Sequence, residues 1–310
     1  MKATRKPPGS PCSNMMPPQR NSCAPKQDRH SLSAVLSWKH VLLFALAMAV
    51  SVIPCCAQKN IAAALNAYGR AGKYPDRVHS SALDTNPAAN EEMCFPWNLS
   101  EVRATTVSVT RLKVPSQARR EYEKACDASY KNNFEEAEQH ARSAIEKFQD
   151  YSAAWVMLGL ILEEQHKAQV AHDACSHAAT IDATYLPAYL CAAEVSVRNQ
   201  EWQGALSSAD LALSLKSQGD AYPNYYRATA YLHMNNLVEA KKSALQAAEI
   251  DVNHSEPSLY FLLAKIYERE GDDASAIAQL QQLLKHHTDR LQENMAKQYL
   301  AKLESQQSTK

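Results

Sequence analysis

The stretch SAAWVMLGLILEEQHKAQVAHDACSHAATI, residues 152–181, decides the fold of this 310-residue chain. Its small residues Gly159, Ala171 and Ala178 stand at set distances from the large residues Trp155 and Leu158. Small residues let two helices cross closely, because a larger side chain would hold their backbones apart. The stretch therefore predicts a pair of tightly packed helices.

The alanine at position 171 belongs to a series that recurs along the second half of the chain. The series is Ala137, Ala171, Ala205, Ala240 and Ala276. Its intervals are 34, 34, 35 and 36 residues. Seven residues after each marker comes another small or apolar residue: Ala144, Ala178, Ala212, Ala247 and Leu283. Twelve residues before each marker lies a further small residue: Ala125, Gly159, Ala193, Ala228 and Ala264. A period of this length is typical of stacked helical repeats.

Short polar turns separate the two helices that we expect in the repeats. They fall at residues 131–133, 199–201, 235–236 and 271–273, and all four contain Asn or Gly. Both residue types tolerate the left-handed conformation that ends a helix. One amphipathic pair cannot bury its apolar face alone, so several pairs must stack on one another.

This pattern resembles the tetratricopeptide repeat (TPR), whose signature combines Trp, Leu, Gly and Tyr in the first helix with Ala in the second. The resemblance covers residues 118–288 and implies an all-α protein, a right-handed α-solenoid of about five helix pairs. The proline that ends many such repeats is replaced by Gln149, Ala183, Ser217, Val252 and Thr288. Residues 289–310 hold a further amphipathic segment, which predicts a C-terminal capping helix and tail.

The N-terminal 57 residues have the features of a secretory signal peptide with a long basic n-region. Residues 41–53 are apolar and uncharged, Lys39 precedes them, and small residues lead to an expected cut after Ala57. Thirteen helical residues span roughly 20 Å, short of the ~30 Å hydrocarbon core of a bilayer. We therefore expect an exported protein of the periplasm or cell surface. The alternative is a retained signal anchor, which would make the protein membrane-anchored.

Residues 58–117 differ from the repeats in composition. Pro, Asn and Ser are frequent between positions 75 and 100, which is typical of a linker. Residues 60–70 could form a short helix, and residues 105–114 alternate apolar and polar side chains as a strand would. We interpret this region as a linker with a possible short helix and strand.

Four cysteines remain after the expected cleavage: Cys94, Cys126, Cys175 and Cys191. We interpret them first as small buried side chains, because free cysteine is among the most buried residue types. Export to an oxidising compartment leaves disulfides open as the alternative. Cys175 and Cys191 could approach each other across adjacent helices.

Composition and motifs give no sign of catalysis or of nucleic-acid binding. Residues 58–310 carry 26 basic and 32 acidic residues, whereas nucleic-acid binding rests on many phosphate-neutralising cations. His166, His172 and His177 are six and five residues apart, which misses the i, i+3 or i+4 spacing of metal ligands on a helix. No hydrolase, nucleotide-binding or zinc-protease motif occurs. We expect no catalytic residues, no metal and no cofactor, and an enzyme site within residues 58–117 is a distant third hypothesis.

The TPR resemblance implies a binding groove on the concave face, lined by the fifth and ninth residues of each repeat. Here these are Tyr122, Cys126, Val156, Leu160, Leu190, Glu194, Tyr225, Thr229, Phe261 and Lys265. The Lys and Asn clamp with which chaperone-binding members hold a C-terminal carboxylate is missing, so we expect a protein or peptide segment with apolar anchors. The alternative is that several of these residues pack internally. The predicted function is an exported scaffold for protein–protein interaction, or else a membrane-anchored assembly factor.

Overall fold

The computed structural model describes residues 94–97, 112–215, 220–252, 254, 256–286 and 290–307. All regular elements in these ranges are helices. The expected signal peptide at residues 1–57 and the possible helix at 60–70 lie outside the described residues. Of the possible strand at 105–114, residues 112–114 are described, and they form no strand.

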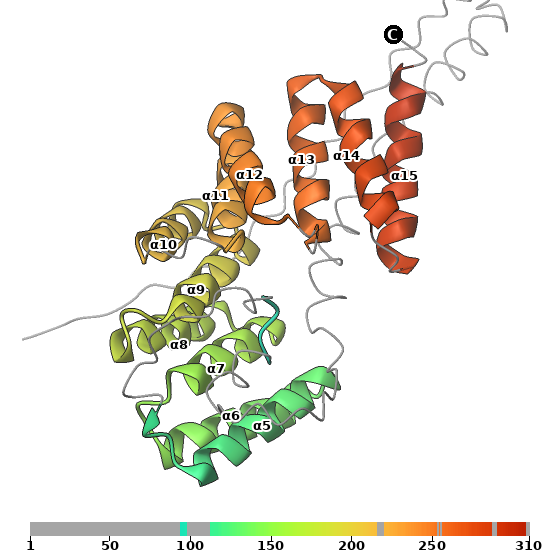
Figure 1. Ribbon diagram of the computed structural model, residues 1–310. Coiled ribbons are helices and arrows are strands. Elements are labelled where there is room, and N and C mark those ends of the chain that lie inside the picture. Colours follow the sequence, from blue (N-terminus) through green and yellow to red (C-terminus); the bar gives the residue numbers. More distant parts are fainter. Residues whose placement is uncertain are drawn as a thin grey trace, which may run out of the picture. The chain divides into compact units, whose positions relative to one another are not determined.

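The helices follow one another as five pairs and a final helix (Figure 1). The first helices of the pairs are α5 (Ser116–Tyr130), α7 (Ser152–Glu164), α9 (Leu186–Arg198), α11 (Tyr222–His233) and α13 (Pro257–Glu270). The second helices are α6 (Phe134–Lys147), α8 (Ala168–Ile181), α10 (Trp202–Ser214), α12 (Leu237–Ile250) and α14 (Asp273–His286). The final helix is α15 (Arg290–Gln307).

Each helix packs against the next, and the first helix of each pair also contacts the first helix of the following pair. The five first helices therefore form one continuous layer, which we call the first-helix layer. The α15 helix packs on α14, where it covers the end of the stack. The expected α-solenoid of five helix pairs with a C-terminal capping helix is confirmed.

The small residues that recur in the sequence lie where helices cross. All five alanines of the marker series have no exposed surface, and the same holds for Ala125, Ala144 and the alanines at the equivalent positions of the other repeats. Gly159 is buried as well, and Leu283 is 1% exposed. Gly159 shows why size matters, because a Cβ atom there would lie 2.6 Å from the Cys175 Sγ and 2.9 Å from the Cys191 Sγ. The small residues that recur in the sequence thus lie where the helices pack most closely.

The turn inside each pair contains one residue in the left-handed conformation. These residues are Asn132, His166, Gln200, Asn235 and Gly271. The residue after each of them donates its backbone N–H to a carbonyl five positions earlier, as Asn133 does to Ala128 at 2.9 Å. This is the hydrogen bond of a Schellman motif, which satisfies a carbonyl at the end of the first helix. Asn133 and Asn236 then cap the second helix, with side chains that accept from the N–H of Glu136 and Glu239.

The four cysteines form two disulfides, Cys94–Cys126 and Cys175–Cys191. Interpreting them first as free buried side chains was therefore wrong. Their burial was correctly expected, since none exceeds 3% exposure. The Cys175–Cys191 bond joins α8 to α9 and so links the second repeat to the third.

No helix in the described part of the chain combines the length and apolar character that a membrane span requires. This finding concerns the repeats and the capping helix, whereas the expected signal or anchor at residues 41–53 is not among the described residues.

Candidate functional site

The candidate site is the exposed side of the first-helix layer, where the fifth and ninth residues of the repeats lie. Six of the ten groove residues are buried, with exposed fractions of 4% or less: Tyr122, Cys126, Val156, Leu160, Leu190 and Phe261. The other four keep partial exposure: Glu194, Tyr225, Thr229 and Lys265. Glu194 lies on α9, and Tyr225, Thr229 and Lys265 lie on α11 and α13, so the partial exposure is concentrated over the last two repeats, where Phe261 is the one buried groove residue. We call the layer over α11 and α13 the open part and the layer over α5, α7 and α9 the closed part.

Residues 94–97 (Cys-Phe-Pro-Trp) cover the closed part, and we call them the covering segment. Cys94 is bonded to Cys126, which occupies a groove position on α5. Phe95 and Trp97 are 0% and 3% exposed, and they belong to the same apolar cluster as groove residues of α5, α7 and α9. Figure 1 shows this segment beside α7. A short piece of chain from outside the repeats therefore fills the first half of the predicted groove.

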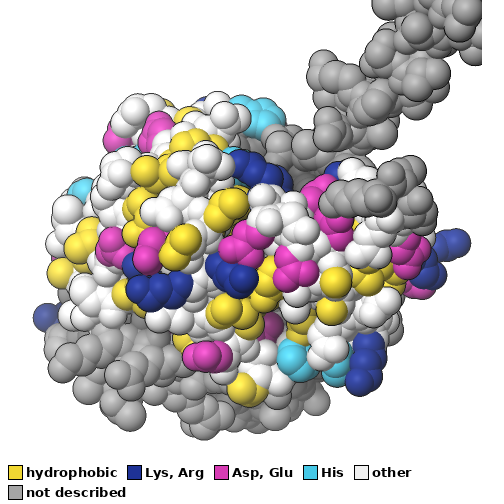
Figure 2. All heavy atoms as spheres, turned by 90° about the horizontal axis from the view of Figure 1, so that it is seen from above, with side chains coloured by type: hydrophobic (Ala, Val, Ile, Leu, Met, Phe, Trp, Pro, Cys, Tyr) yellow, Lys and Arg dark blue, Asp and Glu magenta, His cyan; other side chains and the backbone are white. Residues whose placement is uncertain are grey.

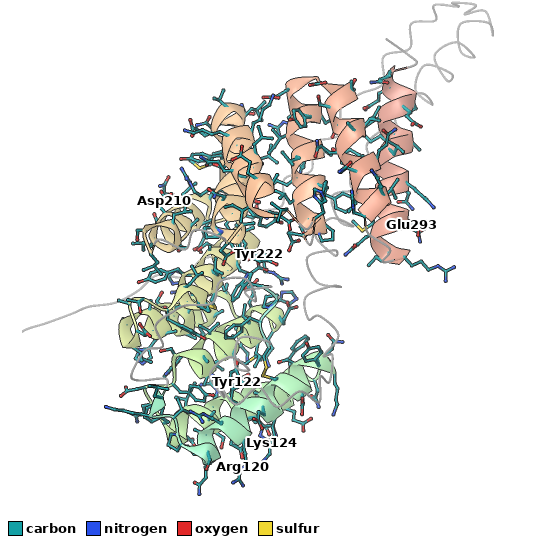
Figure 3. The ribbon with its side chains drawn as sticks, viewed as in Figure 1. Arg120, Tyr122, Lys124, Asp210, Tyr222 and Glu293 are labelled. Carbon is teal, nitrogen blue, oxygen red and sulfur yellow. A yellow bond between two sulfur atoms is a disulfide. The ribbon has the colours of Figure 1, made fainter. Side chains whose placement is uncertain are left out.

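Tyr122 shows how the layer is oriented. It lies on the inner side of α5, 1% exposed, and its ring is 5.4 Å from the ring of Tyr151. Arg120 and Lys124 on the same helix point outward into solvent (Figure 3). The helix thus presents an apolar face to the layer and a charged face, which also carries Glu123 and Asp127, to solvent.

A chain of hydrogen bonds holds the far end of the covering segment. The Trp97 indole N–H donates to the Tyr226 hydroxyl at 2.7 Å, in a buried position. Tyr226 in turn donates to Glu194 Oε2 at 2.9 Å. Arg198 donates to Glu194 at 2.8 Å and also pairs with Glu164 at 3.2 Å. This polar chain joins the covering segment to three helices of the layer.

Burial and neighbouring charges determine the protonation state of Tyr226 and Arg198. Burial, reinforced by the Glu194 carboxylate, raises the pKa of Tyr226 well above its usual value, so the hydroxyl keeps its proton. Burial lowers the pKa of Arg198, but Glu194 and Glu164 outweigh this and raise it above the usual value. The chain of hydrogen bonds therefore runs from the uncharged Trp97 indole to the ion pairs that Arg198 forms with Glu194 and Glu164.

Beyond Trp97 the layer continues with the partly exposed residues of α11 and α13. The Tyr225 ring lies 5.4 Å from the Tyr226 ring, so the open part begins where the covering segment ends. Burial and the neighbouring Arg269 lower the pKa of Lys265. Its neighbour Glu268 accepts from Tyr299 and Lys302 of α15. The open part thus offers aromatic and basic side chains together.

Tyr222, at the start of α11, lies between the two halves of the stack (Figure 3). Its hydroxyl donates to Glu256 Oε2 at 2.8 Å, and burial raises the pKa of that carboxyl. Asp220, 4% exposed, accepts from the backbone N–H of Tyr222 at 2.9 Å. Burial raises the pKa of Asp220 to about 6. Buried carboxyls therefore mark the junction between the third, fourth and fifth repeats.

The histidines considered as metal ligands take structural positions. His166 occupies the left-handed turn between α7 and α8, and the His177 ring packs on Trp155 with centroids 4.3 Å apart. Across the described residues, no three His, Cys, Asp or Glu side chains are grouped as a metal site would require. Basic and acidic side chains are interspersed on the face in Figure 2.

Sequence reasoning missed the covering segment and the polar chain. The spacing of the repeats could not reveal them, because Trp97 and Tyr226 are 129 residues apart and neither partner follows a period. One signal was available: Cys94, Phe95 and Trp97 form a small apolar group within a polar linker. Such a group in a polar linker indicates a segment that packs against a neighbouring surface.

Helix pairs stacked in one layer, with left-handed turns at a period of 34 to 36 residues, define the chain as an α-solenoid. No protein-family model matches the chain, and no curated protein matches it either. Solved structures of TPR proteins do share its fold. TTC0263 of Thermus thermophilus, described as a thermophilic TPR protein, has a TM-score of 0.52 at 17% identity, covering 59% of this chain and 99% of that one.

Two further structures agree. Pseudomonas aeruginosa pilF has a TM-score of 0.52 at 14% identity and covers 61% of this chain and 90% of its own. Yeast Tom70 has a TM-score of 0.53 at 17% identity and covers 70% of this chain, which spans about half, 47%, of Tom70. The fold of this chain is therefore the TPR α-solenoid, and at these identities the likeness concerns the fold.

Proposed function

We propose that the protein is an exported scaffold that binds a segment of another protein on its first-helix layer and catalyses no reaction. The observation that carries this proposal is the covering segment. A layer that already buries Phe95 and Trp97 has the shape and polarity to hold an apolar peptide.

The partner segment would extend over the open part of the layer. Tyr225 lies next to the end of the covering segment and keeps partial exposure, as do Thr229 and Lys265. Aromatic anchors contribute much of the free energy of protein binding. A partner with apolar anchors, and an acidic group facing Lys265, fits this surface.

The first test removes the anchors. A Tyr225→Ala/Lys265→Ala double variant, which truncates two partly exposed groove residues, should lose partners that the full-length protein captures in pull-downs analysed by mass spectrometry. The matched control is Leu211→Ala/Val238→Ala, which truncates apolar residues on second helices that are 53% and 74% exposed. An unchanged partner set in the first variant, with its helices intact, would refute binding on this layer.

We propose export on two grounds, the features of residues 1–57 and the two disulfides. Disulfides persist in oxidising compartments such as the bacterial periplasm and cell surface. Sequencing the mature N-terminus tests the proposal. A start at Gln58 supports a free exported protein, and an intact residue 41–53 segment in a membrane fraction supports the membrane-anchored assembly factor instead.

A further inference from the structure

The third and fifth repeats carry opposite charges at one position of the layer. The positions concerned are the ninth residue of the repeat and the residue four places later, which lie on the same face of the first helix. In α9 they are Glu194 and Arg198, and in α13 they are Lys265 and Arg269. The fifth repeat therefore keeps the arginine of the third and has a lysine where the third has a glutamate.

In α9 the chain neutralises its own arginine. Arg198 donates to Glu194 at 2.8 Å, and it also pairs with Glu164 of the preceding repeat at 3.2 Å. The three side chains are between 10% and 15% exposed. A charge held this far from solvent requires a partner of opposite sign, and the two glutamates supply it.

In α13 the neighbouring carboxylates are engaged by other helices. Glu268 accepts from Tyr299 and Lys302 of α15. Glu270 accepts from Lys241 of α12 at 2.8 Å. Both glutamates therefore bind the elements that pack on either side of α13.

Lys265 and Arg269 are left without a carboxylate partner among the residues that the structure describes. Arg269 donates to the uncharged side-chain oxygen of Asn235 at 2.7 Å. Burial and Arg269 lower the pKa of Lys265, and Glu268 offsets this lowering only in part. Like charges four residues apart repel each other, so an incoming carboxylate would be stabilised by both cations.

Aromatic rings lie beside the two cations. The His233 ring stacks on the Trp202 ring, with centroids 4.1 Å apart and planes inclined by 6°. Burial, together with Lys265 and Arg269, lowers the pKa of His233 to about 4, so this ring is uncharged at neutral pH. The surface thus combines two cations with apolar neighbours.

We propose that the open part of the layer binds an acidic segment of a partner protein, whose Asp or Glu side chain pairs with Lys265 and Arg269 as two glutamates pair with Arg198 in α9. The proposal rests on the proposed function and adds to it the charge that the partner must carry. A long polyanion such as nucleic acid fits less well, because residues 58–310 carry 26 basic and 32 acidic residues and would repel it.

Selection from a library of random displayed peptides tests this charge preference, with the full chain as bait. Peptides that bind the unchanged protein should be enriched in Asp and Glu beside apolar residues. The Lys265→Glu/Arg269→Glu variant should instead select Lys and Arg. The matched control is Arg120→Glu/Lys124→Glu, which makes the same change in net charge on the solvent-facing side of α5 and should keep the acidic preference.

One selected acidic peptide then measures the size of the effect by fluorescence anisotropy. The Lys265→Gln/Arg269→Gln variant removes the two charges without reversing them, and it should bind the peptide at least about tenfold more weakly. Replacing the acidic residue of the peptide by its amide should have the same effect on the unchanged protein. Added salt should weaken the unchanged complex more than the complex of this variant.

The variant that removes the charges decides the matter if charge reversal unfolds the fifth repeat, and circular dichroism checks the helices of both. Selected peptides with no excess of Asp or Glu would overturn the proposal. Binding of inorganic phosphate at the two cations without binding of acidic peptides would also overturn it, because the site would then hold a free anion. Unfolding of both variants would do the same, since the two side chains would then be structural.

Failure of this proposal can be told apart from failure of the proposed function. If the selected peptides lose affinity in a Tyr225→Ala variant but are not acidic, binding on the layer stands and the acidic segment fails. If no selected peptide depends on Tyr225, Lys265 or Arg269, both fail together.

Discussion

The two halves of the first-helix layer differ in what covers them and in what links their repeats. Over α5, α7 and α9 the layer is closed by the covering segment, and two disulfides tie the elements together. Over α11 and α13 Tyr225 and Lys265 keep partial exposure, and ion pairs such as Lys241–Glu270 at 2.8 Å join neighbouring repeats. A disulfide contributes about 2–4 kcal/mol to stability, whereas exposed ion pairs contribute about 0–1 kcal/mol. The first half is therefore the more strongly cross-linked of the two.

The largest effect should follow from removing the disulfide between repeats. The Cys175→Ala/Cys191→Ala variant loses a link that closes 16 residues, which should lower the free energy of unfolding by about 3 kcal/mol. Hydrogen exchange should show faster opening of α8 and α9, while the amides of α13 and α14 serve as the internal control. Equal loss of protection in both halves would contradict the separation of the stack into a cross-linked and a looser part.

Gly159 gives the next largest effect. Its Cβ position lies within 3 Å of both sulfurs of that disulfide and 3.2 Å from the Ala171 carbonyl oxygen, so Gly159→Ala forces the helices apart. We expect a loss of about 2 kcal/mol in urea unfolding, typical of an overpacked core. The matched control is Gly204→Ala in α10, where the three nearest atoms all belong to side chains and the closest, Ser196 Oγ, lies at 3.1 Å. That change should stay within about 1 kcal/mol of the unchanged protein, since alanine also favours the helix. Equal losses in the free energy of unfolding at both sites would mean that the close helix approach at Gly159 does not make this site less tolerant of a Cβ atom.

These two sites also show what the sequence could and could not predict. Gly159 was found from its spacing to Ala171, because close helix crossings demand small residues at a fixed period. The turn at His166 was not predicted, since histidine stands there in place of the Asn or Gly that takes the left-handed conformation in three of the other four repeats. Internal packing of several groove residues was kept only as the alternative, and Tyr122 and Leu190 are buried; the covering segment in the same apolar cluster was not predicted. The covering segment contacts residues that are far from it in the sequence, and the spacing of residues within the repeats cannot predict such contacts.

A smaller, pH-dependent effect is expected where the two halves meet, at Asp220. Its carboxyl is buried, and its pKa is about 6 instead of 3.8, so the folded protein binds more protons than the unfolded chain between these values. The free energy of unfolding should therefore fall as pH rises from 4 to 6. Above pH 6 the Asp220 carboxyl is ionised, and burial of its charge then lowers the free energy of unfolding by the full amount.

An Asp220→Asn variant removes that cost and can still accept the hydrogen bond from Tyr222. We expect it to be more stable than the unchanged protein by about 1–2 kcal/mol at pH 7, with the difference vanishing near pH 4. Thermal unfolding across this pH range measures it. A difference that is constant with pH would show that the carboxyl does not titrate in this window.

The smallest effect concerns the hydrogen bond that joins the covering segment to the open half. Trp97→Phe keeps most of the buried apolar surface and removes the donor to Tyr226, which should cost about 1 kcal/mol. Tyr226→Phe removes the acceptor and also deprives Glu194 of a donor, so it should cost more. A double-mutant cycle on the two positions isolates the bond itself, with an expected coupling energy of about 1 kcal/mol. Strictly additive effects would mean that Trp97 is held by apolar contacts alone.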